Sequence, residues 1–221
     1  MPARAPWIIG VTVVSLLLVG CSSPAEPAST AVPRPTLTAG EGFFDPYSPP
    51  APESTVVPSP DAWKDVHPPA GYTVVLLSFA ADKKHADVVI DAVNAWADEE
   101  NVKVTPLVAE TPNDLIDTTH RAIELEPDLI ISAGDVMVDP LAAVTGGYLS
   151  QQFLIVGAEI AEPTNNVTAV DWTGAGFRGE GLGSPTTYDP ASFTTERADR
   201  AVRAGVAAVI KGARGFVIWV S

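Results

Sequence analysis

The chain has 221 residues, of which 46% are apolar and 18% charged. This composition can supply a core and is not typical of a disordered protein. The formal net charge is −14, from 27 acidic and 13 basic residues, which disfavours nucleic acids and anionic lipid surfaces as partners of the whole chain.

The first 20 residues are typical of a bacterial lipoprotein signal peptide. An apolar stretch at 7–19 follows Arg4; it is shorter than the roughly 20 residues of a membrane span and fits the apolar region of a signal peptide. It ends in "LVGC" (18–21), which resembles the lipobox, in which the cysteine is acylated and becomes the mature N-terminus. Cys21 is the only cysteine, so it has no partner for an intramolecular disulfide. The alternative is an ordinary secretory signal followed by an incidental free cysteine.

Residues 21–70 are predicted to form a disordered, proline-rich tether behind the lipidated Cys21. Residues 22–70 contain 12 prolines, and proline lacks the amide hydrogen that helices and ladders need. Residues 22–60 are therefore expected to add little to stability. Four aromatic residues interrupt this composition, and they either dock on the domain or a partner or stay unpaired: Phe43, Phe44, Tyr47 and Trp63.

The remaining residues, 71–221, are predicted to form one α/β domain. The first strand, "YTVVLLSF" (72–79), is continuously apolar, as a strand buried on both faces should be. Alternation of strands and helices favours a doubly wound, mostly parallel sheet of about six strands with helices on both faces. Strands are expected at 72–79, 102–109, 128–134, 153–159, 166–172 and 215–221, and helices at 82–100, 111–126, about 140–145 and about 194–212.

The last expected strand contains "GFVIWV" (215–220), which has almost no polar side chain. An exposed strand of this kind would be prone to aggregation, because its backbone groups and apolar side chains would face water. We expect it to pair inside the sheet as the sixth strand and to complete the domain.

Two segments, "EPDLIISAGDVMVDPL" (126–141) and "FLIVGAEIAEPTNNVTAVDW" (153–172), resemble the basic membrane lipoprotein family. These are lipid-anchored solute-binding proteins of ABC importers with a type I periplasmic-binding-protein fold, and many are nucleoside receptors. The similarity covers residues 72–220 and corresponds to one lobe, the N-terminal one. It implies a Rossmann-like lobe, a small-molecule ligand, and a transporter permease or a second lobe on another chain as partner.

Candidate binding residues follow the carboxyl ends of the expected strands, where ligands of doubly wound sheets gather. Five carboxylates at these ends would repel phosphate and favour a cation, an amine or a hydroxyl-rich ligand, and two aromatic rings could stack on a ligand ring. The alternative is that acids at helix starts only complement the helix dipole. The candidates are Phe79, Asp82, Glu110, Asp135, Glu159, Asp171 and Trp172.

Other motifs point to no catalytic or cofactor chemistry. His67, His85 and His120 lack metal-ligand spacing, and no nucleophile elbow or Cys–His arrangement occurs in the sequence. The glycine-rich segment 173–185 lacks the Lys-Ser/Thr ending of a phosphate loop. We expect no metal, no cofactor and no enzyme activity.

Two function classes remain open for this chain. One is a solute-binding or sensing lipoprotein on the extracytoplasmic face of the cell membrane, held by its acyl chains and working with an ABC importer. The other is a one-lobe interaction module, presented on the tether to a protein or cell-wall partner.

If Cys21 carries the membrane attachment, a Cys21→Ser variant loses its acyl chains and moves from the membrane fraction to the soluble fraction or the medium. Fractionation followed by immunoblotting measures this. Membrane retention of the variant at the wild-type level would show instead that the apolar run at 7–19 acts as an uncleaved anchor.

Overall fold

The computed structural model describes residues 39–51, 54–82, 86–161, 163–177 and 187–221. Cys21, the expected signal peptide at 1–20 and the first part of the tether lie outside these residues, as do His85 and residues 178–186 of the glycine-rich segment. Within the described part of the chain, no helix is long and apolar enough to cross a membrane.

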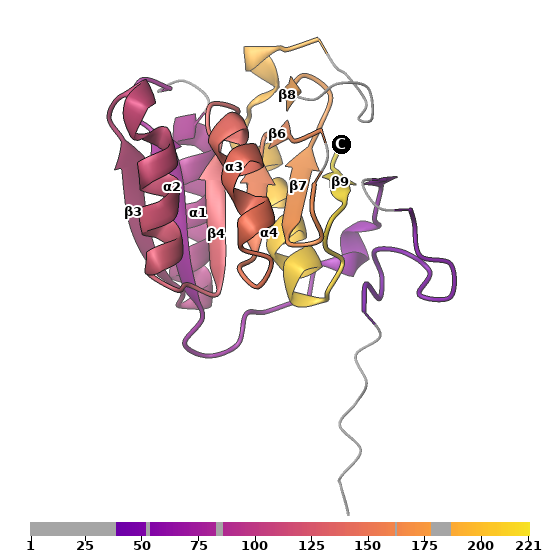
Figure 1. Ribbon diagram of the computed structural model, residues 1–221. Helices are drawn as coiled ribbons and strands as arrows, with labels where there is room; N and C mark the ends of the chain where they lie inside the picture. Colours follow the sequence, from indigo (N-terminus) through magenta and orange to yellow (C-terminus); the bar gives the residue numbers. More distant parts are fainter. Residues whose placement is uncertain (1–38, 52–53, 83–85, 162, 178–186) are drawn as a thin grey trace, which may run out of the picture. The chain divides into compact units, whose positions relative to one another are not determined.

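A seven-stranded sheet runs through the domain, and all of its strand pairs are parallel (Figure 1). The strand order is β1-β9-β7-β5-β4-β2-β3. Six of the strands are those expected from the apolar runs, so the predicted α/β fold is confirmed, and the seventh is β1. The bounds are β1 (Thr55–Val56), β2 (Thr73–Phe79), β3 (Lys103–Ala109), β4 (Leu129–Ala133), β5 (Phe153–Val156), β7 (Val167–Asp171) and β9 (Val217–Trp219).

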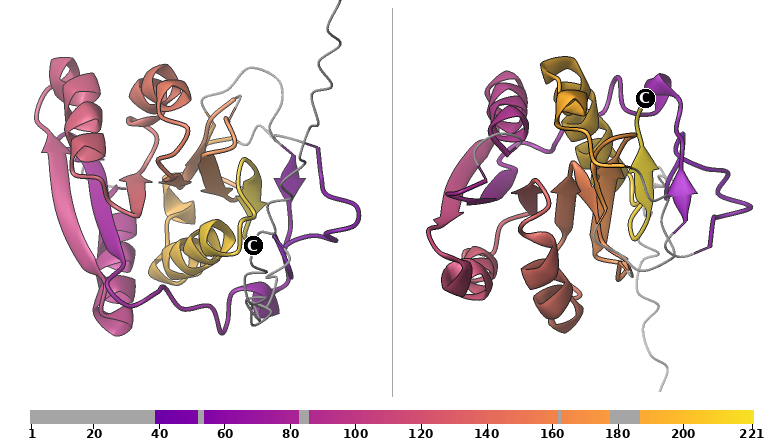
Figure 2. Two further views of the ribbon diagram at one scale, coloured as in Figure 1. Left: turned by 60° about the horizontal axis from the view of Figure 1, so that its bottom comes forward. Right: turned by 90° about the horizontal axis from the view of Figure 1, so that it is seen from above.

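Helices cover both faces of this sheet. Seen from above, α1 (Ala86–Glu100) and α4 (Thr195–Ile210) lie on one face, and α2 (Leu115–Glu124) and α3 (Val138–Val144) lie on the other (Figure 2). Four short 3₁₀ helices occur among the described residues: η1 (Pro60–Ala62), η2 (Pro112–Asp114), η3 (Thr145–Gly147) and η4 (Pro190–Ser192).

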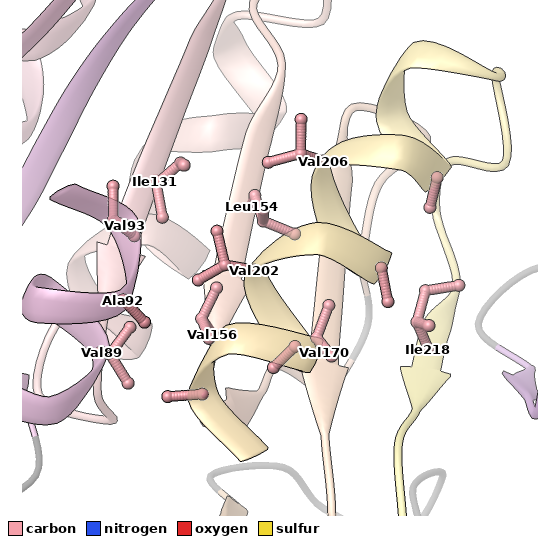
Figure 3. Packing of buried hydrophobic residues seen from close by; sticks show 14 of the residues in the cluster. Val89, Ala92, Val93, Ile131, Leu154, Val156, Val170, Val202, Val206 and Ile218 are labelled. Atoms are coloured by element: carbon pink, nitrogen blue, oxygen red, sulfur yellow. The ribbon is translucent and has the colours of Figure 1, made fainter. Parts of the chain in front are cut away.

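The continuous apolar strands fill two cores because successive side chains point to opposite faces. In β5, Leu154 and Val156 pack in the cluster under α1 and α4 (Figure 3), whereas Phe153 and Ile155 pack in the cluster under α2 and α3. All four side chains are at most 1% exposed. Each such strand therefore serves both layers of helices.

The strand expected at 153–159 is divided at Gly157. Its φ of +82° is a left-handed conformation that favours glycine, and an added Cβ would lie 2.8 Å from a ring carbon of Phe193. After this turn, β6 (Ala158–Glu159) leaves the main sheet and pairs with β8 (Gly176–Phe177) in a small second sheet. The glycine-rich segment 173–185 thus contains a short strand near its start.

The prediction that the last apolar strand pairs inside the sheet is confirmed. β9 pairs with β7 over Ala169–Asp171, and Val217 and Ile218 are buried. It is not the edge of the sheet, however, because β1 pairs with its other side through Thr55 and Val56. The backbone N–H of Val217 donates to the carbonyl of Ser54 at 3.1 Å.

The expected disordered tether up to residue 70 is therefore wrong for the part of it that the structure describes. Phe43 is 4% exposed in the core, and Phe44 contacts Phe216 edge to face with ring centroids 5.3 Å apart. The N–H of Gly40 donates to the carbonyl of Lys211 at 2.7 Å. The described part of the compact unit begins at residue 39 and not at residue 71. Apolar contacts outweigh the proline-rich composition in this segment.

Phe43 and Tyr47 offer a matched pair of substitutions. Phe43→Ala should lower the free energy of unfolding by about 3–5 kcal/mol, because it removes a buried aromatic ring. Tyr47 is 96% exposed, so Tyr47→Ala should change the free energy of unfolding by less than about 0.5 kcal/mol. Urea denaturation measures both variants. Equal small effects would mean that residues 39–66 do not pack on the domain.

Candidate functional site

The strand order creates a topological switch point between β2 and β4. From β2 the chain moves to β3 on one side, and then returns to β4 on the other side of β2. The two crossovers leave in opposite directions, and in open α/β sheets ligands bind outside the carboxyl ends of the strands at such a point. Asp82 follows β2 and Asp135 follows β4. Two of the predicted site residues thus flank the switch point.

Asp82 and Asp135 are brought together with Tyr188. The φ of Gly134 is +81°, and a Cβ added there would lie 2.7 Å from Oδ2 of Asp82, so glycine alone lets this carboxylate approach the backbone. Burial raises the pKa of the Tyr188 phenol, and the negative charges of Asp135 and Asp82 raise it further. We call Asp82, Asp135 and Tyr188 the switch-point cluster.

Phe79 is linked to this cluster through its backbone, whereas Glu110 is not. Phe79 is half-buried at the end of β2, and its carbonyl accepts the N–H of Asp82 at 3.1 Å. Glu110 is exposed beyond the end of the edge strand β3. Among the described residues it makes no hydrogen bond or ion pair. Glu110 remains a predicted site residue without a structural link to the cluster.

The other three predicted residues, Glu159, Asp171 and Trp172, are at most 1% exposed. The indole N–H of Trp172 donates to Oγ of Ser192 at 3.0 Å, and its ring meets Phe193 edge to face with centroids 5.0 Å apart. The segment that contains η4 therefore covers the carboxyl end of β7. In this conformation Trp172 supports the fold and does not face a ligand.

Asp171 is an acid held in the protein interior. Its Oδ1 accepts the N–H of Trp172 at 2.8 Å, and its Oδ2 has no hydrogen-bond partner among the described residues. Burial raises the pKa of Asp171 to about 8; the Trp172 hydrogen bond opposes this rise and the charge of Glu159 adds to it. The protonated form of Asp171 therefore predominates at neutral pH.

Sequence reasoning missed Tyr188, Ser192 and Phe193. They follow the glycine-rich segment and precede α4, so no strand end draws attention to them. The available signal was local: Asp189 and Pro190 start a tight turn, in which Oδ1 of Asp189 accepts the N–H of Ala191 at 2.9 Å. Aromatic residues on both sides of such a turn indicate a loop that packs back on the domain.

The described residues contain no group of three or more His, Cys, Asp or Glu side chains placed to hold a metal ion. The switch-point cluster contributes two carboxylates and one phenol. This set can accept hydrogen bonds from hydroxyl or ammonium groups and offers one aromatic face. It contains no side-chain cation to hold a phosphate.

No protein-family profile matches the chain, and no curated protein matches it. Among solved structures, an ABC-transporter solute-binding protein from Aeropyrum pernix K1 is 22% identical with a TM-score of 0.42, over 47% of this chain and 29% of that one. A fragment of a predicted lipoprotein from Peptoclostridium difficile 630 is 16% identical with a TM-score of 0.45, over 64% and 97%. A periplasmic ribose ABC transporter protein from Conexibacter woesei DSM 14684 is 16% identical with a TM-score of 0.34, over 68% and 54%.

The chain thus spans less than a third of the Aeropyrum protein and about half of the Conexibacter protein. The basic membrane lipoprotein family is not among these matches, and the resemblance at 126–171 stays a prediction.

The pKa of Asp171 leads to a prediction on stability. An aspartate in an unfolded chain has a pKa of about 4, so the native chain holds an extra proton between this value and about pH 8. The free energy of unfolding should fall as pH rises through that window and level off above it. Asp171→Asn removes the ionisation, so its thermal midpoint should exceed that of the wild type by more at pH 9 than at pH 5.

Thermal unfolding at pH 5, 7 and 9 measures this difference. Asp117→Asn, an exposed change in α2, serves as the matched control and should show no such dependence. Equal shifts for Asp171→Asn at pH 5 and pH 9 would contradict a raised pKa.

Proposed function

We propose that this protein is a lipid-anchored, extracytoplasmic protein that binds a small hydroxylated or cationic solute at the switch-point cluster. The observation that carries the proposal is the convergence of Asp82, Asp135 and Tyr188 at the point where open α/β sheets bind ligands. Neither carboxylate lies on the outer face of a helix, where acids serve only solubility.

The charge of the cluster selects the ligand class. Two carboxylates near one another repel phosphate and carboxylate groups, which disfavours nucleotides. They attract amines and accept hydrogen bonds from sugar hydroxyls. Tyr188 is 46% exposed, so its ring can lie against a sugar or a base. Nucleosides, sugars and amines therefore fit better than phosphorylated molecules.

The proposed location and partners follow from the N-terminal sequence and from the family resemblance. Acylation of Cys21 would hold the protein on the membrane through buried CH₂ groups, each contributing about 0.8 kcal/mol. The permease of an ABC importer, or a second lobe on another chain, would then complete the site.

A second candidate is an interaction module without a solute. It is favoured by the closure of the carboxyl end of β7, where Trp172 is fully buried under Ser192 and Phe193. The chain itself fills this part of the edge, which removes Trp172 from the residues that could contact a ligand.

A binding experiment separates the two candidates. Ribose, adenosine and spermidine are titrated into the wild type and into Asp82→Asn and Asp135→Asn, with binding followed by calorimetry and by the thermal midpoint. Glu124→Gln, an exposed change at the end of α2, is the matched control. We expect the wild type to bind at least one probe. Each cluster variant should bind that probe about tenfold or more weakly, because a charged hydrogen-bond acceptor is removed. The control variant should bind it with the wild-type affinity. Binding that survives both substitutions, or no binding of any probe, would contradict solute binding at this cluster.

A further inference from the structure

A cavity of about 330 Å³ lies between η1, α1 and α4, away from the switch point. Trp96 and Glu100, in the last turns of α1, line the cavity. Because α1 starts near the carboxyl end of β2 and runs back along the sheet, its last turns lie near the edge where the strands begin. The cavity is therefore at the opposite edge of the sheet from the switch point. Its size falls at the lower end of the range of small-molecule sites. One wall is the segment 60–66, which the sequence had predicted to be an unstructured tether.

Basic side chains gather around this cavity although the chain as a whole is acidic. The described residues contain eight of the 13 Lys and Arg side chains, and three of these eight line the cavity: Lys64, Arg200 and Arg203. The guanidinium of Arg203 is held by Asp199 at 2.9 Å and by Glu99 at 2.6 Å. Lys64 and Arg200 form no ion pair among the described residues.

The acidic residues of the lining already have partners. Glu100 accepts from Nδ1 of His67 at 2.9 Å, and Asp199 is the partner of Arg203. Lys64 and Arg200 are thus the charged side chains of the lining that have no ion-pair partner among the described residues, and both are positive. The whole chain has a net charge of −14, which keeps anions away from most of its surface. The lining of this cavity has three cations and two carboxylates, so the sign of the charge is reversed locally.

The rest of the lining is apolar and aromatic. Trp63, at the end of η1, is half-buried, whereas Trp96 and Val206 are each 2% exposed. The segment that carries Trp63 is fixed on both sides, because Ala62 is buried and His67 bonds to Glu100. A rigid aromatic wall next to unpaired cations is suited to a ligand that has an anionic group on an apolar body.

We propose that this cavity is a second binding site, for an anion that carries an apolar or aromatic body. A free organic carboxylate or sulfonate and the head of an anionic phospholipid share this chemistry. The inference goes beyond the proposed function, because its ligand has the opposite charge and its residues belong to a different part of the domain. It also gives the folded-back segment 60–66 a role in forming a binding wall.

The test compares two probes with nearly the same rings, the anion 8-anilinonaphthalene-1-sulfonate and the neutral N-phenyl-1-naphthylamine. They are titrated by fluorescence into the chain from residue 21 onward, with Cys21→Ser to prevent acylation. The double variant Lys64→Gln/Arg200→Gln should lose about tenfold or more in affinity for the sulfonate, since two attractive charges are removed, and should bind the neutral probe as the wild type does. Arg121→Gln, an exposed change on α2, is the matched control.

Trp63→Ala should weaken both probes, because it removes the shared aromatic wall, and circular dichroism verifies that each variant is folded. Vesicles of phosphatidylglycerol identify the source of the anion. If the protein sediments with the vesicles and this depends on Lys64 and Arg200, the ligand is a phospholipid head group. If the protein binds the sulfonate but does not sediment with the vesicles, the ligand is a free anion. Sulfonate affinity in the double variant within twofold of the wild type would overturn the proposal, as would equal affinity of the wild type for the two probes.

Discussion

The burial of a parallel sheet on both faces is the constraint on which the rest of this structure depends. Strands such as β4 and β5 are apolar at nearly every position, so both faces and any apolar edge have to be covered. Helix pairs α1/α4 and α2/α3 cover the faces (Figure 2). The edge at β9 is covered by β1, which a proline-rich stretch supplies. The N-terminal segment is therefore part of the domain, and its position also forms one wall of the cavity beside Trp63.

The same constraint shapes the carboxyl edge of the sheet. The η4 segment closes the β7 side, where it buries Trp172 and leaves Asp171 in an apolar environment that favours its protonated form. The crossovers diverge at the β2–β4 side, and Asp82 and Asp135 flank that switch point. One edge thus combines a closed part that stabilises the fold with the switch point at which we propose that a ligand binds.

The fold was predictable from the sequence because β2, β4, β5 and β7 are long apolar runs whose burial does not depend on distant details. β1 was not, because its two residues are too short for periodicity and are flanked by prolines. Asp82 and Asp135 follow from the rule that ligands gather at strand ends. The burial of Trp172 depends on Ser192, 20 residues away, and the position of Tyr188 depends on the return of a loop. Contacts of that kind have no local sequence signal.

Amide hydrogen exchange of the native protein tests most directly whether the N-terminal segment belongs to the domain. Hydrogen bonds join the backbone of Gly40 to Lys211 and that of Ser54 to Val217. Peptides that cover 40–44, 54–63 and 216–219 should therefore be protected well above the rates of an unfolded chain, and residues 216–219 should lose protection when residues 39–57 are deleted. Exchange of 40–63 at unfolded-chain rates, with 216–219 still protected in the deletion variant, would contradict a domain that needs this segment.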